Sequence, residues 1–226
     1  MWKKDRPKLD DSKVGGLAFF LSLIVVIPLA VYGTLFLFIH TDRAALANFG
    51  RFALGAVAGA TLAKLTIRGH TSVFIHELKH SIIANLVGNK ATEWRIRKNA
   101  GHFQYEFTEK TRGYNAFISL APYWLPLFTL LTLGVGLAGW HSDWTTVAFI
   151  VGIGWGADAL LNLRDVAPYQ TDFSDLRGGF PIGLTYVTAL NLLLTALLLT
   201  FIGWGTHGLK LLGTSAFATL HQIVIR

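Results

Sequence analysis

Long apolar runs separated by short polar segments dominate the pattern along the chain. A helix that crosses a bilayer needs about 20 apolar residues, and runs long enough lie at 14–39, 114–139, 145–163 and 182–204. The stretch 44–88 is also apolar, but TIRGHTS interrupts it at 66–72. This stretch predicts either two spans or one span and a partly inserted helix. We therefore expect an all-α polytopic membrane protein with about five to six transmembrane or partly inserted helices.

Residues 89–112 change from a helical pattern to an alternating one. Trp94 and Ile96 alternate with two arginines, and the second alternating stretch, FQYEF, follows the turn-forming KNAG. A period of two predicts a β-hairpin over 93–108 with one apolar face. Because lipid cannot satisfy an open strand edge, this hairpin must lie against protein or at the membrane interface.

Two glycine patterns predict close packing between helices. Gly55 and Gly59 form a GxxxG motif, which lets two membrane helices approach closely. Gly152, Gly154 and Gly156 form a GxGxG motif inside an apolar run. Because no strand precedes this motif, helix packing is favoured over nucleotide binding.

Composition agrees with the membrane class. Hydrophobic residues make up 52% of the 226 residues, and charged residues only 15%. The net charge of +7 comes from basic residues at the ends of apolar runs, as in membrane proteins, so nucleic-acid binding is not expected. The basic segment 1–13 predicts a cytoplasmic N-terminus, and 206–226 predicts a weakly amphipathic interfacial tail.

The densest chemistry lies in FIHELKHSII at 74–83, within the interrupted stretch. Thr71 or Ser72 is the expected N-cap of its helix, and Gly88 is the expected stop. HELKH is an HExxH motif, in which His76 and His80 project from one side of the helix and can share a metal ion.

Glu77 lies near enough to that pair to take a proton from a metal-bound water. The alternative is chance polarity at a helix end. Ionisable groups at membrane depth are costly, which favours the metal site. Lys79, in the same motif, is expected to face the membrane interface.

Two histidines leave zinc short of ligands, and the chain contains no cysteine, so a carboxylate is the favoured third ligand. Asp172 and Asp175 follow the break at Pro168, where the chain can turn back into the bundle. Both also fit a second explanation, with Asp172 as a helix N-cap and Asp175 as its partner. Asn162 can pack between helices with Asp158.

Taken together, these features resemble the site-2 protease family of intramembrane zinc metalloproteases. The resemblance rests on HELKH in a membrane helix, followed by a hairpin, two spans and the loop TDFSDLRGGFP. This loop and FISLAPYWLPL are similar to the compact bacterial branch. The likeness covers about 70–190 of a single domain, 1–226. The larger family's Asn-Pro…Asp-Gly signature is absent, since no proline follows Asn162 and Phe173 follows Asp172.

The resemblance implies Zn²⁺ held by His76, His80 and Asp172, with Glu77 as the catalytic base and Asn162 in substrate binding. It implies proteolysis of a membrane-embedded or membrane-proximal peptide in a bacterial cell membrane. The hairpin then either holds an extended substrate on its strand edge or only packs as a lid.

Other functions stay open at this point. A non-catalytic membrane binding protein would keep the motif for its structure, and an ion-conducting protein would use the buried polar groups as a path. Hydrolysis of a soluble or lipid-modified peptide would keep the chemistry and change the substrate.

Overall fold

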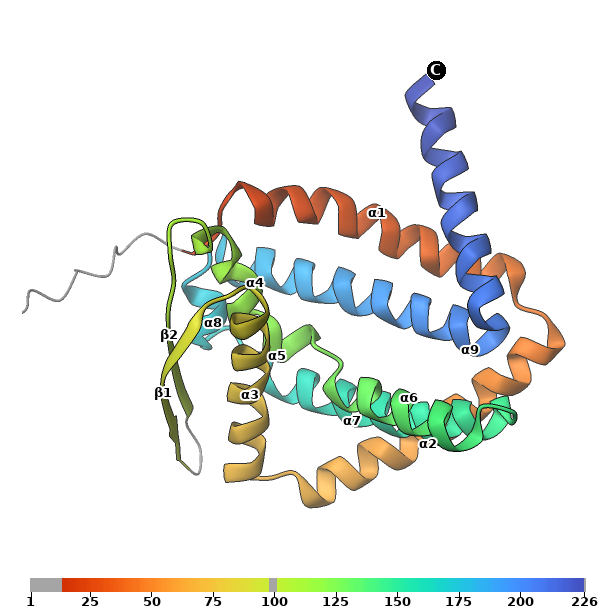
Figure 1. The fold of residues 1–226 in the computed structure, drawn as a ribbon, viewed down its shortest axis with the longest axis horizontal. Helices are drawn as coiled ribbons and strands as arrows, with labels where there is room; N and C mark the ends of the chain where they lie inside the picture. Colours follow the sequence, from red (N-terminus) through yellow and green to blue (C-terminus); the bar gives the residue numbers. More distant parts are fainter. Residues whose placement is uncertain (1–13, 98–100, 226) are drawn as a thin grey trace, which may run out of the picture.

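The computed structural model describes residues 14–97 and 101–225, which are mostly helical. Within these residues, four helices are long and apolar enough to cross a membrane. They are α1 (Leu17–His40), α2 (Arg43–Thr66), α7 (Trp144–Asp165) and α9 (Gly179–Ile225). Figure 1 shows α1, α2, α7 and the first part of α9 running along roughly one common direction, with α1 against α9 and α2 against α7. The expected helical, membrane-like fold is confirmed at this level.

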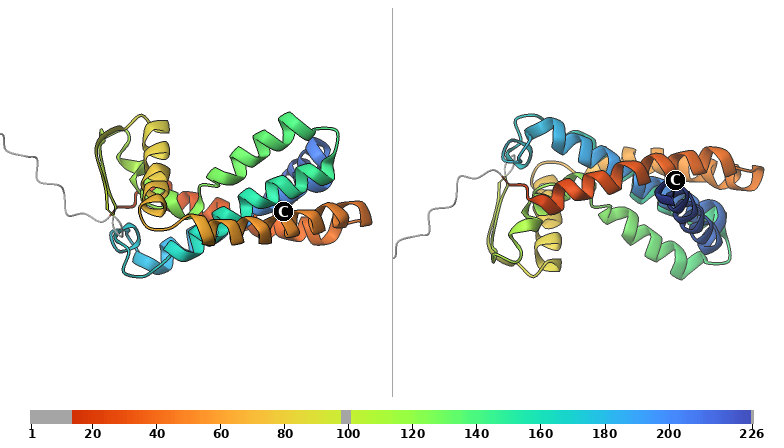
Figure 2. Two further views of the ribbon diagram at one scale, coloured as in Figure 1. Left: turned by 90° about the horizontal axis from the view of Figure 1, so that it is seen from below. Right: turned by 90° about the horizontal axis from the view of Figure 1, so that it is seen from above.

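Helix α3 (His70–Leu86) contains the HExxH motif and lies across the direction of the long helices, at one end of the bundle (Figures 1 and 2). The predicted N-caps Thr71 and Ser72 are wrong, because the helix starts after Gly69. Gly69 has φ 53, a left-handed conformation that glycine adopts at little cost, and it turns the chain sharply out of α2. The expected stop is confirmed, since Gly88 follows the helix with φ 83.

The predicted hairpin is confirmed. Strand β1 (Lys90–Ile96) pairs antiparallel with β2 (Gly101–Glu106), with a register shift between Ala91 and Glu93. Its apolar face carries Phe103 and Tyr105, which pack against a core cluster of α3, α4 and α5 residues. Residues 98–100 of the expected KNAG turn lie outside the described residues.

The predicted continuous span over 114–139 is wrong. The chain there divides into a 3₁₀ turn (Arg112–Tyr114) and the helices α4 (Asn115–Ser119), α5 (Ala121–Trp124) and α6 (Leu127–Trp140). Pro126 causes the main break, because proline has no N–H to continue a helix and disfavours helical geometry in the preceding residue. Leu125 accordingly has ψ 114, an extended conformation.

The connection between α7 and α9 returns to the same end of the bundle as α3. It contains the short helix α8 (Thr171–Ser174). The Val14 N–H donates to the Asp175 carbonyl at 2.7 Å, and the Arg177 N–H donates to the Val14 carbonyl at 2.7 Å. Phe173 and Leu176 are buried in a cluster that includes Phe19 of α1. These contacts fix α8 in position beside the start of α1.

The last long helix bends at Gly205, where φ is 63 and ψ is −150. Beyond this residue the helix continues to Ile225 and projects away from the bundle in Figure 1. The predicted tail is therefore helical, and its place at a membrane interface stays a prediction. Residues 1–13, the expected cytoplasmic segment, lie outside the described residues.

Both glycine patterns lie at close helix contacts, as predicted. Gly55, Gly59, Gly152 and Gly156 lie where α2 and α7 meet, and Gly154 faces α6. A Cβ built on Gly59 would come within 1.9 Å of the Ile153 carbonyl oxygen, and one on Gly156 within 1.9 Å of the Ala56 carbonyl oxygen. Only glycine permits such an approach between the two backbones.

We expect Gly156→Leu to lower the free energy of unfolding in detergent micelles by about 1–3 kcal/mol, because the added side chain must separate α2 from α7. The matched control is Gly134→Leu in α6, where an added Cβ meets open space among the described residues. Chemical unfolding curves measure both variants. Equal stability of the two variants would contradict the close helix contact.

Candidate metal centre

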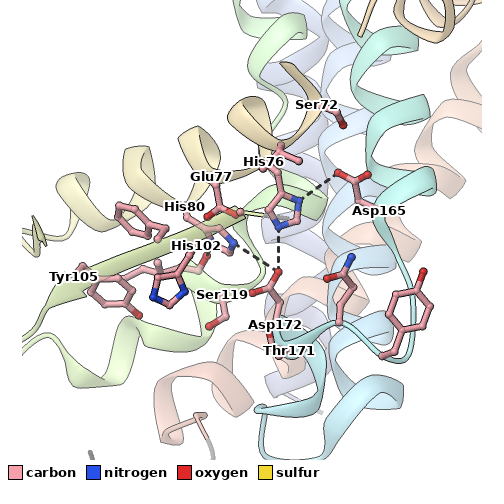
Figure 3. A pocket seen from close by; sticks show the side chains of 16 residues that line it. Ser72, His76, Glu77, His80, His102, Tyr105, Ser119, Asp165, Thr171 and Asp172 are labelled. Atoms are coloured by element: carbon pink, nitrogen blue, oxygen red, sulfur yellow. Dashed lines mark hydrogen bonds and ion pairs between the residues drawn. The ribbon is translucent and has the colours of Figure 1, made fainter. Parts of the chain in front are cut away.

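Three side chains from distant parts of the sequence converge between α3 and α8. The His76 Nε2 lies 3.2 Å from the Asp172 Oδ2, and the His80 Nε2 lies 3.6 Å from the same oxygen. Figure 3 shows these side chains pointing at one another across the end of the bundle. The structure thus brings together the two motif histidines and the aspartate that the resemblance implies as the third ligand.

Hydrogen bonds determine which nitrogen of each imidazole faces Asp172. The His76 Nδ1–H donates to the Asp165 Oδ2 at 3.2 Å, and the His80 Nδ1–H donates to the Ile118 carbonyl at 2.7 Å. The Nε2 atoms then direct lone pairs toward a carboxylate. These electron-rich atoms repel one another unless a cation, either a metal ion or a bound proton, lies between them.

The geometry of these three groups suits a metal ion. One donor atom from each residue lies within 4.8 Å of the other two. Zinc bonds of about 2.0–2.1 Å in a tetrahedron place neighbouring ligand atoms about 3.3 Å apart, close to the observed separations. Two imidazoles, a carboxylate and one open position are also the ligand set of catalytic zinc sites. The same donors suit other divalent transition metals.

Asp172 contacts the histidines of this cluster and does not cap a helix. Gln170 is the N-cap residue of α8, so the capping explanation for Asp172 is wrong. The Tyr123 hydroxyl donates to the Asp172 Oδ2 at 2.8 Å. Burial opposes ionisation of Asp172, but the adjacent imidazoles of His80 and His76 hold its pKa below the ordinary value.

The other candidate carboxylates lie elsewhere. Asp175 follows α8, is exposed, and accepts a hydrogen bond from the Ser174 hydroxyl. Asp158 is buried against Lys79, with 3.3 Å between its Oδ1 and the Lys79 Nζ. Asp165 contacts the far nitrogen of His76, on the side away from Asp172. Among these aspartates only Asp172 meets both Nε2 atoms.

We therefore expect Asp172→Ala to weaken the affinity for added zinc, because it removes a donor atom of the cluster. Asp175→Ala is the matched control, three residues along the chain, and should leave zinc affinity unchanged within about twofold. Competition titration against a chelator measures both variants. Equal zinc affinity in Asp172→Ala and wild-type protein would exclude Asp172 as a ligand.

Glu77 lies beside the cluster, in the wall of an open cavity of about 470 Å³. Residues of α3, β2, α4, the end of α7, the segment after it and the start of α8 form this cavity. The Glu77 side chain is 6% exposed, and burial raises the pKa of its carboxyl above the ordinary value, although both imidazoles oppose the shift. A Cβ on Gly101 would come within 2.0 Å of the Glu77 Oε1, so strand β2 passes directly over this carboxylate.

Lys79 and Asn162 lie together in a buried contact, away from the places that their predicted roles require. Lys79 is 1% exposed, so its expected place at the membrane interface is wrong. Its ammonium donates to the Asn162 Oδ1 at 3.1 Å and to the Pro122 carbonyl at 3.3 Å. Asn162 also contacts Asn191 and is not one of the cavity-lining residues in the described structure. Its role in substrate binding stays a prediction.

Sequence reasoning missed two partners of the cluster, Asp165 and Tyr123. Asp165 was not among the predicted site residues. The available signal was spacing, because Asp158, Asn162 and Asp165 fall at i, i+4 and i+7, which is one face of a helix. Tyr123 carried no such signal, since nothing in its local pattern points to Asp172, 49 residues away.

Comparisons with known proteins leave the family of this chain undetermined. No protein-family model, curated protein or solved structure matches it. The interpretation of the site therefore depends on its residues, their spacing and their geometry.

Proposed function

We propose that this protein is an integral-membrane zinc metalloprotease that hydrolyses peptide bonds in membrane-embedded or membrane-proximal segments. The observation that carries the proposal is the outward hydrogen bonding of both motif histidines, which leaves two Nε2 atoms and Asp172 around one point. An adjacent carboxylate, Glu77, faces the same cavity.

A zinc ion held by His76, His80 and Asp172 would supply a Lewis acid and lower the pKa of its bound water. Glu77 would accept the proton of the attacking water on a carboxylate oxygen and return it to the leaving amine. Its burial supports this role, because a raised pKa brings a carboxylate closer to the working pH of a general base.

The position of the cavity supports a substrate segment near one membrane surface. Asp165 is the last residue of α7, Gly179 is the first of α9, and Leu17 is the first of α1. The end of α7 and the starts of α9 and α1 lie at the end of the bundle where α3 runs across the long helices (Figure 2). With the N-terminus in the cytoplasm, the cavity faces the cytoplasmic side of the bilayer, and a substrate reaches it as an extended segment at the end of a span.

The shape of the cavity wall supports the same substrate class. Strand β2 contributes Gly101, Phe103 and Tyr105 to the wall, and Gly101 lies directly against the Glu77 carboxylate. An extended peptide can add to a strand, whereas a helical segment keeps its peptide bonds shielded. The hairpin therefore offers a guide for a segment that has left its helix.

The test is cleavage by the purified, zinc-loaded protein in lipid vesicles. The substrates are single-span model proteins whose cytoplasmic flanks carry extended segments of graded distance from the span. We expect cleavage at or near the span end, loss of cleavage with a zinc chelator, and recovery on adding zinc. A protein that binds zinc and cleaves none of these substrates would support a non-catalytic binding role instead.

A further inference from the structure

Helix α7 presents a row of polar side chains to the motif helix. Asp158, Asn162 and Asp165 lie on one face and contact α3 at two residues. Lys79 pairs with Asp158 and Asn162, and His76 pairs with Asp165. Packing between helices explains the contact of Lys79 with Asp158 and Asn162. It does not explain the contact of His76 with Asp165.

The contact between His76 and Asp165 can set the orientation of the His76 ring. Its Nδ1 lies 3.2 Å from the Asp165 Oδ2, and its Nε2 lies 3.2 Å from the Asp172 Oδ2. The ring is therefore held between carboxylates from two elements, α7 and α8. Figure 3 shows Asp165 and Asp172 on opposite sides of the His76 ring.

We propose that Asp165 is a positioning residue for His76: it accepts the Nδ1 proton, fixes the tautomer with a free Nε2, and holds the ring toward the metal position. This proposal rests on the metal site of the proposed function. A histidine ligand whose other nitrogen donates to a carboxylate binds metal more tightly, because the tautomer and orientation are set in advance and the ligand is more basic.

The contact of Lys79 with Asp158 and Asn162 helps to orient α3 on α7. Lys79 lies one turn after His76 on α3, and its partners lie one and two turns before Asp165 on α7. Because α3 crosses the direction of α7, two separated polar contacts restrain the crossing angle more than a single contact does. Two contacts fix the crossing, so that the Nδ1 of His76 meets Asp165 and its Nε2 meets Asp172.

A purely structural role for Asp165 has a different signature. Asp165 also lies 3.4 Å from the Arg164 Nε, and Arg164 donates to the Ile67 carbonyl at 2.9 Å and to the Ser72 hydroxyl. Arg164 thereby ties α7 to Ile67, which lies between α2 and α3, and to the first turn of α3, without a hydrogen bond to His76. If Asp165 acted only by orienting Arg164, then Arg164→Gln would weaken zinc binding as much as a change of Asp165.

The experiment measures zinc affinity of the full chain in detergent by chelator competition, together with the unfolding temperature of the metal-free protein. We expect Asp165→Asn to weaken zinc affinity about 10–100-fold, the range found for partners of histidine ligands. Asp165→Glu, which keeps the charge, should bind zinc more tightly than Asp165→Asn. Arg164→Gln should stay within about twofold of wild type, the usual range for a substitution outside the site.

Three results would overturn the proposal. The first is wild-type zinc affinity in Asp165→Asn. The second is an equal loss in Asp165→Asn and Arg164→Gln. The third is a loss of affinity matched by a collapse of the metal-free fold in both Asp165 variants, which would mark a structural role.

The experiment distinguishes failure of the positioning role from failure of the proposed function. Wild-type protein that binds zinc while Asp165→Asn binds it equally well refutes the positioning role and leaves the protease proposal standing. Wild-type protein that binds no zinc refutes both. Wild-type protein that binds zinc with the expected loss in Asp165→Asn, but cleaves no peptide, supports the positioning role and refutes the protease.

Discussion

The Glu77→Gln variant is expected to lose about 10²–10⁴-fold in turnover, the usual contribution of a general base, while it keeps wild-type zinc content. The two effects separate because Glu77 is distinct from the converging donors His76, His80 and Asp172. Glutamine has nearly the same shape and preserves the contact with strand β2 at Gly101, but it cannot accept the proton. Initial cleavage rates and metal analysis of the same preparation measure both effects.

Two control variants separate loss of the base from loss of the metal and from unspecific effects. His80→Ala should lose zinc and activity together, because it removes one of the converging donors. Glu109→Gln changes a carboxylate that is 89% exposed and should leave both quantities unchanged. Wild-type turnover in Glu77→Gln would refute Glu77 as the base, and loss of zinc in that variant would make it a ligand.

The second large effect is on stability. We expect Lys79→Ala to lower the free energy of unfolding by about 3–5 kcal/mol, the cost of leaving a buried charge without its partner. Asp158 would keep hydrogen bonds from the Thr129 N–H and hydroxyl at its Oδ2, but its Oδ1 would lose the lysine. Chemical unfolding in detergent micelles measures the change.

The double variant Lys79→Met/Asp158→Asn distinguishes this explanation from lost packing. Removing both charges of a buried pair is often close to neutral, so the double variant should recover most of the stability lost in Lys79→Ala. Lys64→Ala, on the exposed last turn of α2, is the surface control. A loss below about 1 kcal/mol in Lys79→Ala would contradict this account, because that is the range of exposed ion pairs.

Periodicity was enough to predict the parts of the fold that depend on local pattern. The apolar runs at 14–39, 145–163 and 182–204 correspond to α1, α7 and the first part of α9, and strict alternation predicted the hairpin. The run at 114–139 failed because hydropathy ignores backbone geometry. Pro126 divides that run without making it any less apolar.

The site was predictable where chemistry follows spacing within one helix. His76, Glu77 and His80 are ligand and base candidates by the HExxH pattern alone. The choice of Asp172 over Asp175 rested on resemblance, because both follow the same helix break, and the structure places only Asp172 beside the histidines.

Roles that depend on a crossing between helices could not be found in this way. Lys79 appears interfacial in its local sequence because its partners, Asp158 and Asn162, lie about 80 residues away on α7. Asp165 meets His76 only because α3 turns across the bundle at Gly69. Neither contact has a local signature.

The most direct test of the central claim is metal analysis of the purified protein after zinc loading and removal of free metal. We expect stoichiometric zinc in the wild-type protein and a near-complete loss in His76→Ala, with the metal-free unfolding temperature of the variant close to that of metal-free wild type. Wild-type protein that retains no more zinc than His76→Ala would contradict the account.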